Sequence, residues 1–160
     1  SSLMKGILMA AHRMIPKKCD SWLTKIDKLS EWLNARGVKV VTGKRVDSRY
    51  EPSEKAIYLQ VTKDKEEAFY TLLHECGHVL IEQNGKSFYR SYPLPDPGDW
   101  CDLMATKDVV QQVSIIAEEL EAWNRGERLA SRLGLEIQRR RWNKTRSVCV
   151  SGYMHYILGQ

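Results

Sequence analysis

One short stretch, YTLLHECGHVLIEQ from Tyr70 to Gln83, constrains the fold of this chain more than any other part. Helical residues four apart lie on one face, so His74 and His78 can point both imidazoles at one ion. Glu75 is rotated by about 100° from His74, which places its carboxylate beside an ion rather than on it. The stretch therefore predicts a helix with a metal site and Glu75 as general base. A helix with two buried structural histidines is the alternative.

Hydrophobic periodicity predicts the elements around this helix. Two segments rich in β-branched or alternating apolar residues precede it and are separated by turn residues. A segment rich in proline and aromatic residues follows it, and loops of that length usually serve a function. The expected elements are a helix within Asp20–Gly37, strands Val38–Val41 and Ala56–Val61, the motif helix Lys65–Gln83, a loop Lys86–Ala105, one or two helices within Thr106–Gly134 and a tail helix Trp142–Leu158. The expected fold class is α+β, with a small, mostly antiparallel sheet packed on the HExxH helix and on a second helix that bears a glutamate.

A third metal ligand is sought among three glutamates of the later helix, because no histidine follows His78 before His155. At 100° per residue, that helix presents a main apolar face. The members of this main apolar face are Val109, Val113, Ile116, Leu120 and Trp123. Glu118 points away from the face towards solvent, and Glu121 flanks its edge.

Glu119 belongs to a second stripe in which small residues are frequent. The members of this small-residue stripe are Ile115, Glu119, Ala122, Gly126, Ala130 and Leu133. Small side chains let two helices approach closely, which suits a carboxylate that must reach a metal on a neighbouring helix. We therefore rank Glu119 first as the third ligand, Glu121 second and Glu118 third. A solvated surface glutamate is the alternative for each of them.

Together these residues resemble the gluzincin metallopeptidases, and most closely the ImmA/IrrE-like family of bacteria, phages and mobile elements. The typical family motifs, HExGH and E-x-E-A-N/D-x-F-A, correspond here to HECGH and ELEAWNRGERLA, and the resemblance spans roughly residues 38–135. It implies a minimal zincin-like fold and a zinc-dependent hydrolase of peptide bonds. His74, His78 and Glu119 would be the Zn2+ ligands and Glu75 the catalytic base. The substrate that it implies is a regulatory protein such as a repressor.

Trp123 departs from the family pattern, which has Asn or Asp four residues after the glutamate ligand. An indole N–H only donates, so Trp123 cannot accept the second N–H of a ligating histidine. Asn124, Asp108 or a backbone carbonyl would have to take that role.

An extended protein or peptide substrate is expected to pair with the edge of the Ala56–Val61 strand. The side chains expected to contact this substrate are Tyr58, Leu59, Gln60, Tyr89 and Tyr92. The Lys86–Ala105 loop would border the cleft. Tyr89, Tyr92 or His155 would stabilise the oxyanion, and the sequence does not rank these three.

The composition indicates one globular domain. The chain has 160 residues, a formal charge of +5, 42% hydrophobic and 28% charged residues. We expect a single domain over 1–160, with a core of about 20–135 and a basic helical segment over 136–160. Much of the excess charge lies in Arg125–Arg146, which could contact nucleic acid or an acidic partner, although a solvated basic helix end is the commoner explanation. The alternative function is therefore a regulatory module that binds nucleic acid or protein, with a structural or vestigial zinc site.

No apolar run is long enough to cross a membrane, and the apolar part of the N-terminal segment, Gly6–Ala11, is too short for a signal peptide. The four cysteines, Cys19, Cys76, Cys101 and Cys149, are scattered and form no Cys-x-x-Cys pair, so reduced thiols are expected. These features favour a cytoplasmic protein, and the resemblance favours a bacterium or a phage in its host.

Overall fold

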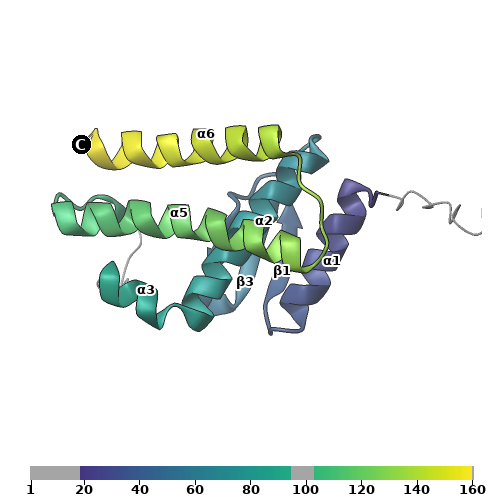
Figure 1. The fold of residues 1–160 in the computed structure, drawn as a ribbon, viewed down its shortest axis with the longest axis horizontal. Coiled ribbons are helices and arrows are strands. Elements are labelled where there is room, and N and C mark those ends of the chain that lie inside the picture. The colour runs from purple at the N-terminus through teal and green to yellow at the C-terminus, as the bar shows by residue number, and fades with distance from the viewer. Residues whose placement is uncertain (1–18, 95–102, 160) are drawn as a thin grey trace, which may run out of the picture.

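The computed structural model describes residues 19–94 and 103–159, which form an α+β arrangement (Figure 1). Its elements are α1 Trp22–Asn34, β1 Lys39–Gly43, β2 Arg49–Glu51, the 3-10 turn η1 Pro52–Glu54, β3 Ala56–Gln60, α2 Lys65–Asn84, α3 Lys86–Ser91, α5 Val109–Arg132 and α6 Arg139–Leu158. The expected first helix, motif helix and tail helix are all confirmed. The segment 106–134 forms one helix, α5, rather than two.

The sheet has three strands in the order β1-β3-β2. β3 pairs in parallel with β1 and antiparallel with β2, so a mixed sheet takes the place of the mostly antiparallel one that was expected. The reason is β2, a three-residue strand that the sequence pattern did not indicate. The chain reverses before β2 and again at η1, where Lys55 adopts a left-handed conformation with φ of 47°. Two reversals leave β3 running in the same direction as β1.

The motif helix α2 is the element around which the others pack, with contacts to α1, β2, β3, α5 and α6. Asp64 caps its N-terminus by accepting a hydrogen bond from the backbone N–H of Glu67, and the acidic first turn suits the helix dipole. Core residues that pack together here are Leu29, Leu33, Ile57, Leu59, Phe69, Leu72, Leu73 and Val79. Burial of these apolar side chains fixes the helix that carries both histidines.

Two glycines let α2 and α5 approach until their backbones touch. A Cβ on Gly77 of α2 would lie 1.9 Å from the carbonyl oxygen of Ala122. A Cβ on Gly126 of α5 would lie 2.4 Å from the carbonyl oxygen of Leu73. No side chain fits at either position, so the small residues of α5 allow the close helix approach that the sequence predicts. Their close approach places Glu119 against the histidine face of α2.

Apart from Leu133, which is exposed just after the helix ends, the small-residue stripe is the buried face of α5, whereas the main apolar face expected from periodicity is wrong for most of its members. Val109, Val113 and Leu120 are 69%, 53% and 42% exposed. Trp123, by contrast, is buried as expected. The buried residues of α5 include Ile115, Glu119, Ala122, Trp123, Gly126, Leu129 and Ala130. Both stripes are apolar enough to pack, and the closer contact available at Gly126 decides between them.

The tail helix α6 runs alongside α5 in the opposite direction (Figure 1). Trp142 is fully buried, and its ring lies 5.4 Å from Tyr70 and 5.0 Å from Trp123. Trp142 and Val150 belong to the main core cluster. The core therefore extends beyond residue 135, because the tail helix supplies a large aromatic side chain.

Part of the expected Lys86–Ala105 loop is helical, since α3 occupies its first six residues. Its residues 95–102, with Cys101, and the N-terminal segment Gly6–Ala11 lie outside the described residues. Cys19, Cys76 and Cys149 are free thiols, as expected. Within 19–94 and 103–159, no helix combines the length and the hydropathy needed to span a membrane.

Candidate metal centre

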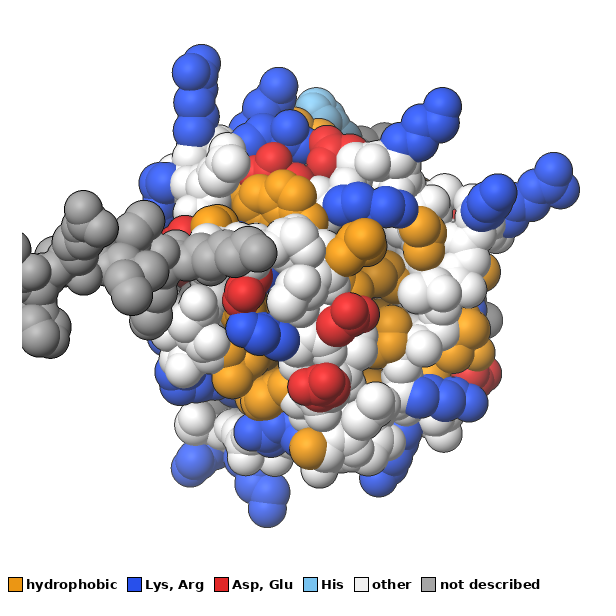
Figure 2. Space-filling view, turned by 90° about the vertical axis from the view of Figure 1, so that its right-hand side faces the viewer, with side chains coloured by type: hydrophobic (Ala, Val, Ile, Leu, Met, Phe, Trp, Pro, Cys, Tyr) orange, Lys and Arg blue, Asp and Glu red, His pale blue; other side chains and the backbone are white. Residues whose placement is uncertain are grey.

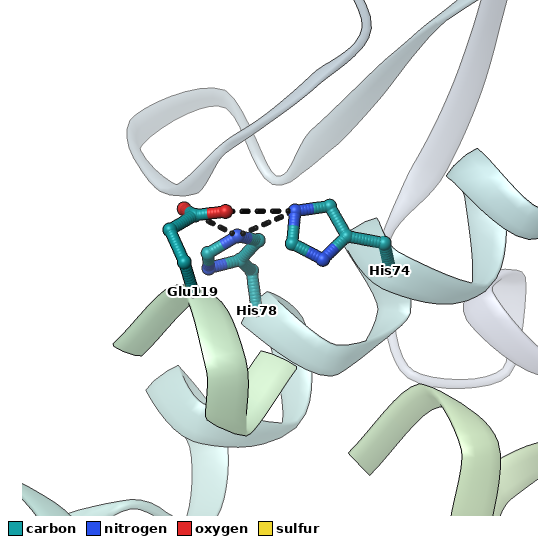
Figure 3. A group of neighbouring side chains, drawn as sticks. All are labelled: His74, His78 and Glu119. Atoms are coloured by element: carbon teal, nitrogen blue, oxygen red, sulfur yellow. Dashed lines mark hydrogen bonds and ion pairs between the residues drawn. The ribbon is translucent and has the colours of Figure 1, made fainter. Parts of the chain in front are cut away.

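His74 and His78 of α2 and Glu119 of α5 point their polar atoms at one another (Figure 3). The Nε2 atoms of the two histidines are 3.2 Å apart. Glu119 Oε2 lies 3.1 Å from His74 Nε2, and Glu119 Oε1 lies 3.2 Å from His78 Nε2. These are the three side chains ranked first from the sequence, and together they form a possible metal-binding triad.

The spacing within the triad fits the ligand set of a tetrahedral ion. Ligand atoms about 2.0–2.1 Å from a tetrahedral Zn2+ are about 3.3 Å from one another. The three distances of 3.1, 3.2 and 3.2 Å are close to that value. Glu119 Oε2 is also buried, and no described residue donates a well-aligned hydrogen bond to it, although His74 Nε2 lies only 3.1 Å away. An oxygen and a nitrogen so arranged are better placed to share an ion than to bond each other.

Burial and charge determine the protonation of the triad. Burial lowers the pKa of His78, but the negative charge of Glu119 and hydrogen bonds to Glu118 and Glu119 outweigh it and raise that pKa well above its ordinary value. Burial raises the pKa of Glu119, but the positive charge of His78 outweighs it and lowers the pKa to about 2. Glu119 is therefore an anion, and a buried anion needs a cation beside it. A proton on His78 or a metal ion in the triad meets that need.

Glu75 is buried next to the triad and is not one of its ligands, as its rotation on the helix predicted. Its Oε2 accepts a hydrogen bond of 2.8 Å from the backbone N–H of Tyr50, in the edge strand β2. The hydroxyl of Tyr50 donates to Glu82, two turns further along α2. Within the described part of the chain, Glu75 Oε1 makes no hydrogen bond. The edge strand therefore fixes one oxygen of Glu75 and leaves the other available.

His78 has a polar partner behind its triad-facing nitrogen. Its Nδ1 lies 3.5 Å from Glu118 Oε1, and the hydroxyl of Tyr89 in α3 lies 3.5 Å from the same oxygen. Metal-binding histidines commonly donate their second N–H to a carboxylate in this way. The interpretation of Glu118 as a solvated residue is therefore wrong. Its side chain is only 12% exposed, because His78 and Tyr89 cover it.

His74 has an aromatic neighbour instead of a polar one. The ring of Trp123 stacks on its imidazole, with centroids 4.5 Å apart and planes at 20°. His74 Nδ1 and Trp123 Nε1 are both buried, and neither has a hydrogen-bond partner among the described residues. Each unpaired buried N–H costs about 1–3 kcal/mol. The environment of His74 is therefore apolar where that of His78 is polar.

The polar groups expected to replace the missing acceptor at position 123 do not do so. Asp108 caps the N-terminus of α5, roughly 16 Å along the helix from Glu119. Asn124 is exposed and lines a groove between α3 and α5. No backbone carbonyl in the described part of the chain accepts a hydrogen bond from His74 Nδ1 either.

Glu121, the second-ranked ligand, is paired with cations. Its Oε1 accepts hydrogen bonds of 2.8 Å from Arg125 and 3.1 Å from Arg128. It faces the groove between α3 and α5 rather than the histidines. The ranking of Glu119 above Glu121 is consistent with this geometry.

Tyr153 of α6 lies near the triad and was not among the site residues indicated by the sequence. It packs against the small apolar cluster that includes Ile115 and Ile157. Burial, followed by the negative charges of Glu119 and Glu75, raises the pKa of its hydroxyl. Tyr153 lies four residues before Ile157 on an apolar helix face. This pattern is typical of a core residue, so the sequence did not indicate that Tyr153 lies near the triad. Only the packing of α6 over α5 reveals its proximity.

The three residues expected to stabilise an oxyanion have other surroundings. The hydroxyl of Tyr89 contacts Glu118. Tyr92 is 38% exposed and lines the groove between α3 and α5, and His155 is exposed on α6. Tyr89 is thus linked to the triad through Glu118.

β3 offers no free edge to a peptide, because it pairs with β1 on one side and β2 on the other. Leu59 is buried, while Tyr58 and Gln60 hydrogen-bond to neighbouring segments of the chain. The expectation that a substrate pairs with Ala56–Val61 is therefore wrong. It failed because β2 was not expected from the sequence. The edge beside the site belongs to β2, whose Tyr50 N–H points at Glu75.

Two of the cavities lined by described residues lie away from the triad. A groove of about 550 Å³ between α3 and α5 is lined by residues that include Phe88, Tyr92 and Leu120. A second cavity of about 400 Å³ lies between the end of α5 and the start of α6. Neither is lined by Glu75 or a triad residue.

His78, with its side chain 15% exposed, is the most accessible member of the triad.

Several arginines of Arg125–Arg146 are paired with carboxylates. The pairs are Arg125 and Arg128 with Glu121, Arg139 and Arg146 with Glu127, and Arg141 with Asp64 and Glu66. In Figure 2, Lys and Arg side chains are spread over the face shown, with Asp and Glu side chains among them. Part of the positive charge therefore serves to join α6 to α5 and α2.

Comparisons with known proteins found no match to a protein-family model, to a curated protein or to a solved structure.

Proposed function

We propose that this protein is a zinc-dependent metallopeptidase that hydrolyses a peptide bond of a protein substrate. The observation that carries the proposal is the convergence of two imidazoles and a carboxylate at 3.1–3.2 Å, with Glu75 beside them. Two histidines and a glutamate are a ligand set of catalytic zinc sites, which keep a fourth position for water. A purely structural site has no need of a base such as Glu75. The resemblance of HECGH and ELEA to the ImmA/IrrE-like gluzincins supports the same assignment.

A zinc ion held by His74, His78 and Glu119 would lower the pKa of a bound water towards neutrality and polarise the substrate carbonyl. Glu75 Oε1 would act as the general base that takes a proton from the attacking water, and it would return that proton to the leaving amine. The backbone N–H of Tyr50 holds Oε2, so that the carboxylate keeps one orientation during both transfers. We assign oxyanion stabilisation to the hydroxyl of Tyr153, which packs against the apolar cluster that includes Ile115, one turn before Glu119 on α5.

The substrate strand is assigned to the outer edge of β2. β2 is an edge strand, and the N–H of Tyr50 on its outer side reaches Glu75. Because the N–H of Tyr50 already donates to Glu75, an extended peptide on that edge would pair with other backbone groups beside it and would lie next to Glu75 and the triad. The resemblance implies a regulatory protein, such as a repressor, as the target in a bacterial or phage-infected cytoplasm.

Metal analysis of purified variants tests the proposal. Wild type and Glu75→Gln should each hold one zinc per chain, while His74→Ala and Glu119→Ala should hold almost none. Glu121→Ala is the matched control, since that carboxylate pairs with arginines, and it should keep its zinc. The proposal is wrong if wild type holds no zinc, or if Glu121→Ala loses it while Glu119→Ala keeps it.

Activity measurements separate the peptidase from a binding module. Cleavage of a quenched fluorescent peptide mixture should disappear in Glu75→Gln, while zinc content is unchanged. Tyr153→Phe should lower kcat by about 100-fold, also with unchanged zinc. Salt-dependent binding to duplex DNA that persists in Glu75→Gln, without cleavage in wild type, would favour a nucleic-acid-binding module with a vestigial site instead.

A further inference from the structure

We propose that Trp123 is a positioning residue that holds the His74 imidazole in its metal-binding orientation by ring stacking. The inference rests on the proposed zinc site and deepens it, because it says how one ligand is kept in place. The two rings are 4.5 Å apart at 20°, and both residues are buried. This close, nearly parallel contact covers the face of the imidazole and restricts rotation of its plane.

The indole of Trp123 is itself fixed by the core. Its other neighbour is Trp142 of α6, at 5.0 Å and 70°. Trp142 is held in turn by a hydrogen bond of 3.1 Å from its Nε1 to Glu127 Oε2. Trp123 is 1% exposed, so it has no room to turn away from His74. The core as a whole therefore holds Trp123 in the position from which it stacks on His74.

On the side of the ring away from the triad, no described residue offers His74 a hydrogen bond that could orient it. Its Nδ1 has no partner within the described residues, whereas His78 Nδ1 has Glu118. A ligating histidine with neither restraint would lose rotational freedom each time it binds an ion, which weakens binding. The stack therefore does for His74 what the Glu118 carboxylate does for His78.

The stack also favours the metal-bound form of His74 over the free form. An imidazole that donates its Nε2 lone pair to a cation becomes electron-poor. The face of an indole carries partial negative charge and attracts an electron-poor partner. Trp123 thus contributes to zinc affinity through both orientation and charge.

The experiment compares zinc affinity and tryptophan emission in the full-length chain. Affinity is measured by competition with a chromophoric zinc chelator in wild type, Trp123→Leu, Trp123→Phe and Trp142→Phe. Trp142→Phe is the matched control, because Trp142 packs in the same core and contacts Trp123 but has no ring contact with His74. Trp123→Leu should lower zinc affinity by about 10–100-fold. Trp123→Phe, which keeps a stacking ring, and Trp142→Phe should stay within about threefold of wild type.

Emission supplies a readout that packing alone does not move. Zinc should change tryptophan emission in wild type and in Trp142→Phe, and this change should be absent in Trp123→Phe. Equal loss of affinity in Trp123→Leu and Trp142→Phe, or an emission change that survives in Trp123→Phe, would overturn the inference. If Trp123→Leu does not fold by circular dichroism, the two phenylalanine variants decide. If wild type binds zinc and Trp123→Leu binds it with equal affinity, the stacking inference fails and the proposed function stands. If wild type binds no zinc, the proposed function fails as well.

Discussion

His74 and His78 lie one turn apart on the same helix, yet their surroundings are opposite in character. On the His78 side, Glu118 and Tyr89 form a polar layer at the edge of the protein. On the His74 side, Trp123 and Trp142 form an aromatic layer that belongs to the main core. One triad therefore spans a polar boundary and a hydrophobic core.

This difference predicts which substitutions near the site alter zinc affinity alone and which also alter folding. Changes in the polar layer should alter the affinity for zinc with little effect on folding, because its carboxylate lies near the surface. Changes at Trp123 should alter both, because its side chain stacks on His74 and also packs against Trp142 of α6. Zinc that binds only the folded chain should in turn stabilise it, by about 2.7 kcal/mol at a free zinc concentration one hundred times Kd.

The largest expected loss of zinc affinity follows substitution of Glu119, the ligand that lies between the two sides. Glu119→Ala removes a ligand that contacts both histidines, so zinc affinity should fall by far more than the roughly 100-fold typical of an outer partner. Chelator competition measures this loss. The matched Glu121→Ala should remain within about threefold of wild type, and a similar loss in both variants would break the assignment.

Gly77→Ala tests the scaffold on which both sides depend. The added Cβ would lie 1.9 Å from Ala122 O, so α2 and α5 must separate, and the free energy of unfolding should fall by about 3 kcal/mol. Denaturant titration measures the change. Gly152→Ala is the control, because its Cβ meets no atom within 4 Å in α6. It should raise the free energy of unfolding by up to about 1 kcal/mol, and an equal loss in both variants would refute the close approach.

Glu118→Gln tests the polar layer alone. Loss of the charge behind His78 Nδ1 should weaken zinc binding by about tenfold, because the imidazole becomes a poorer donor to the ion. The free energy of unfolding of the zinc-free protein should change by less than about 1 kcal/mol. Chelator competition and denaturant titration report the two quantities. A loss of stability without a loss of affinity would show that Glu118 has a structural function.

Tyr89→Phe should have the smallest effect. The hydroxyl of Tyr89 lies 3.5 Å from Glu118, at the limit of a hydrogen bond, so its removal should lower zinc affinity by less than about threefold. The same competition assay measures it. A loss as large as that of Glu118→Gln would mean that Tyr89, rather than Glu118, organises the polar layer.

The sequence was sufficient for features that depend on spacing along one helix. The i, i+4 rule placed His74 and His78 together and kept Glu75 off the ion. The small residues around Glu119 indicated close helix packing, and Gly77 and Gly126 provide it. These signals are local or pairwise, so they can be recognised without coordinates.

Features that depend on which surfaces meet could not be obtained in the same way. β2 is only three residues long, and its absence from the expected strands left β3 with a free edge that it does not have. The main apolar face of α5 is more hydrophobic than the small-residue stripe, so periodicity favoured the face that packing against α2 did not select. Glu118 becomes a neighbour of His78, and Tyr153 a neighbour of Glu119, only when separate helices pack together.

X-ray absorption at the zinc K edge of the zinc-loaded protein tests the central claim most directly. The account predicts a first shell of nitrogen and oxygen at about 2.0–2.1 Å, with the outer-shell scattering of two imidazoles and no sulfur. Glu119→Ala, which should hold almost no zinc, should not give this two-imidazole spectrum. A sulfur shell at about 2.3 Å, or fewer than two imidazoles in wild type, would contradict the triad of His74, His78 and Glu119.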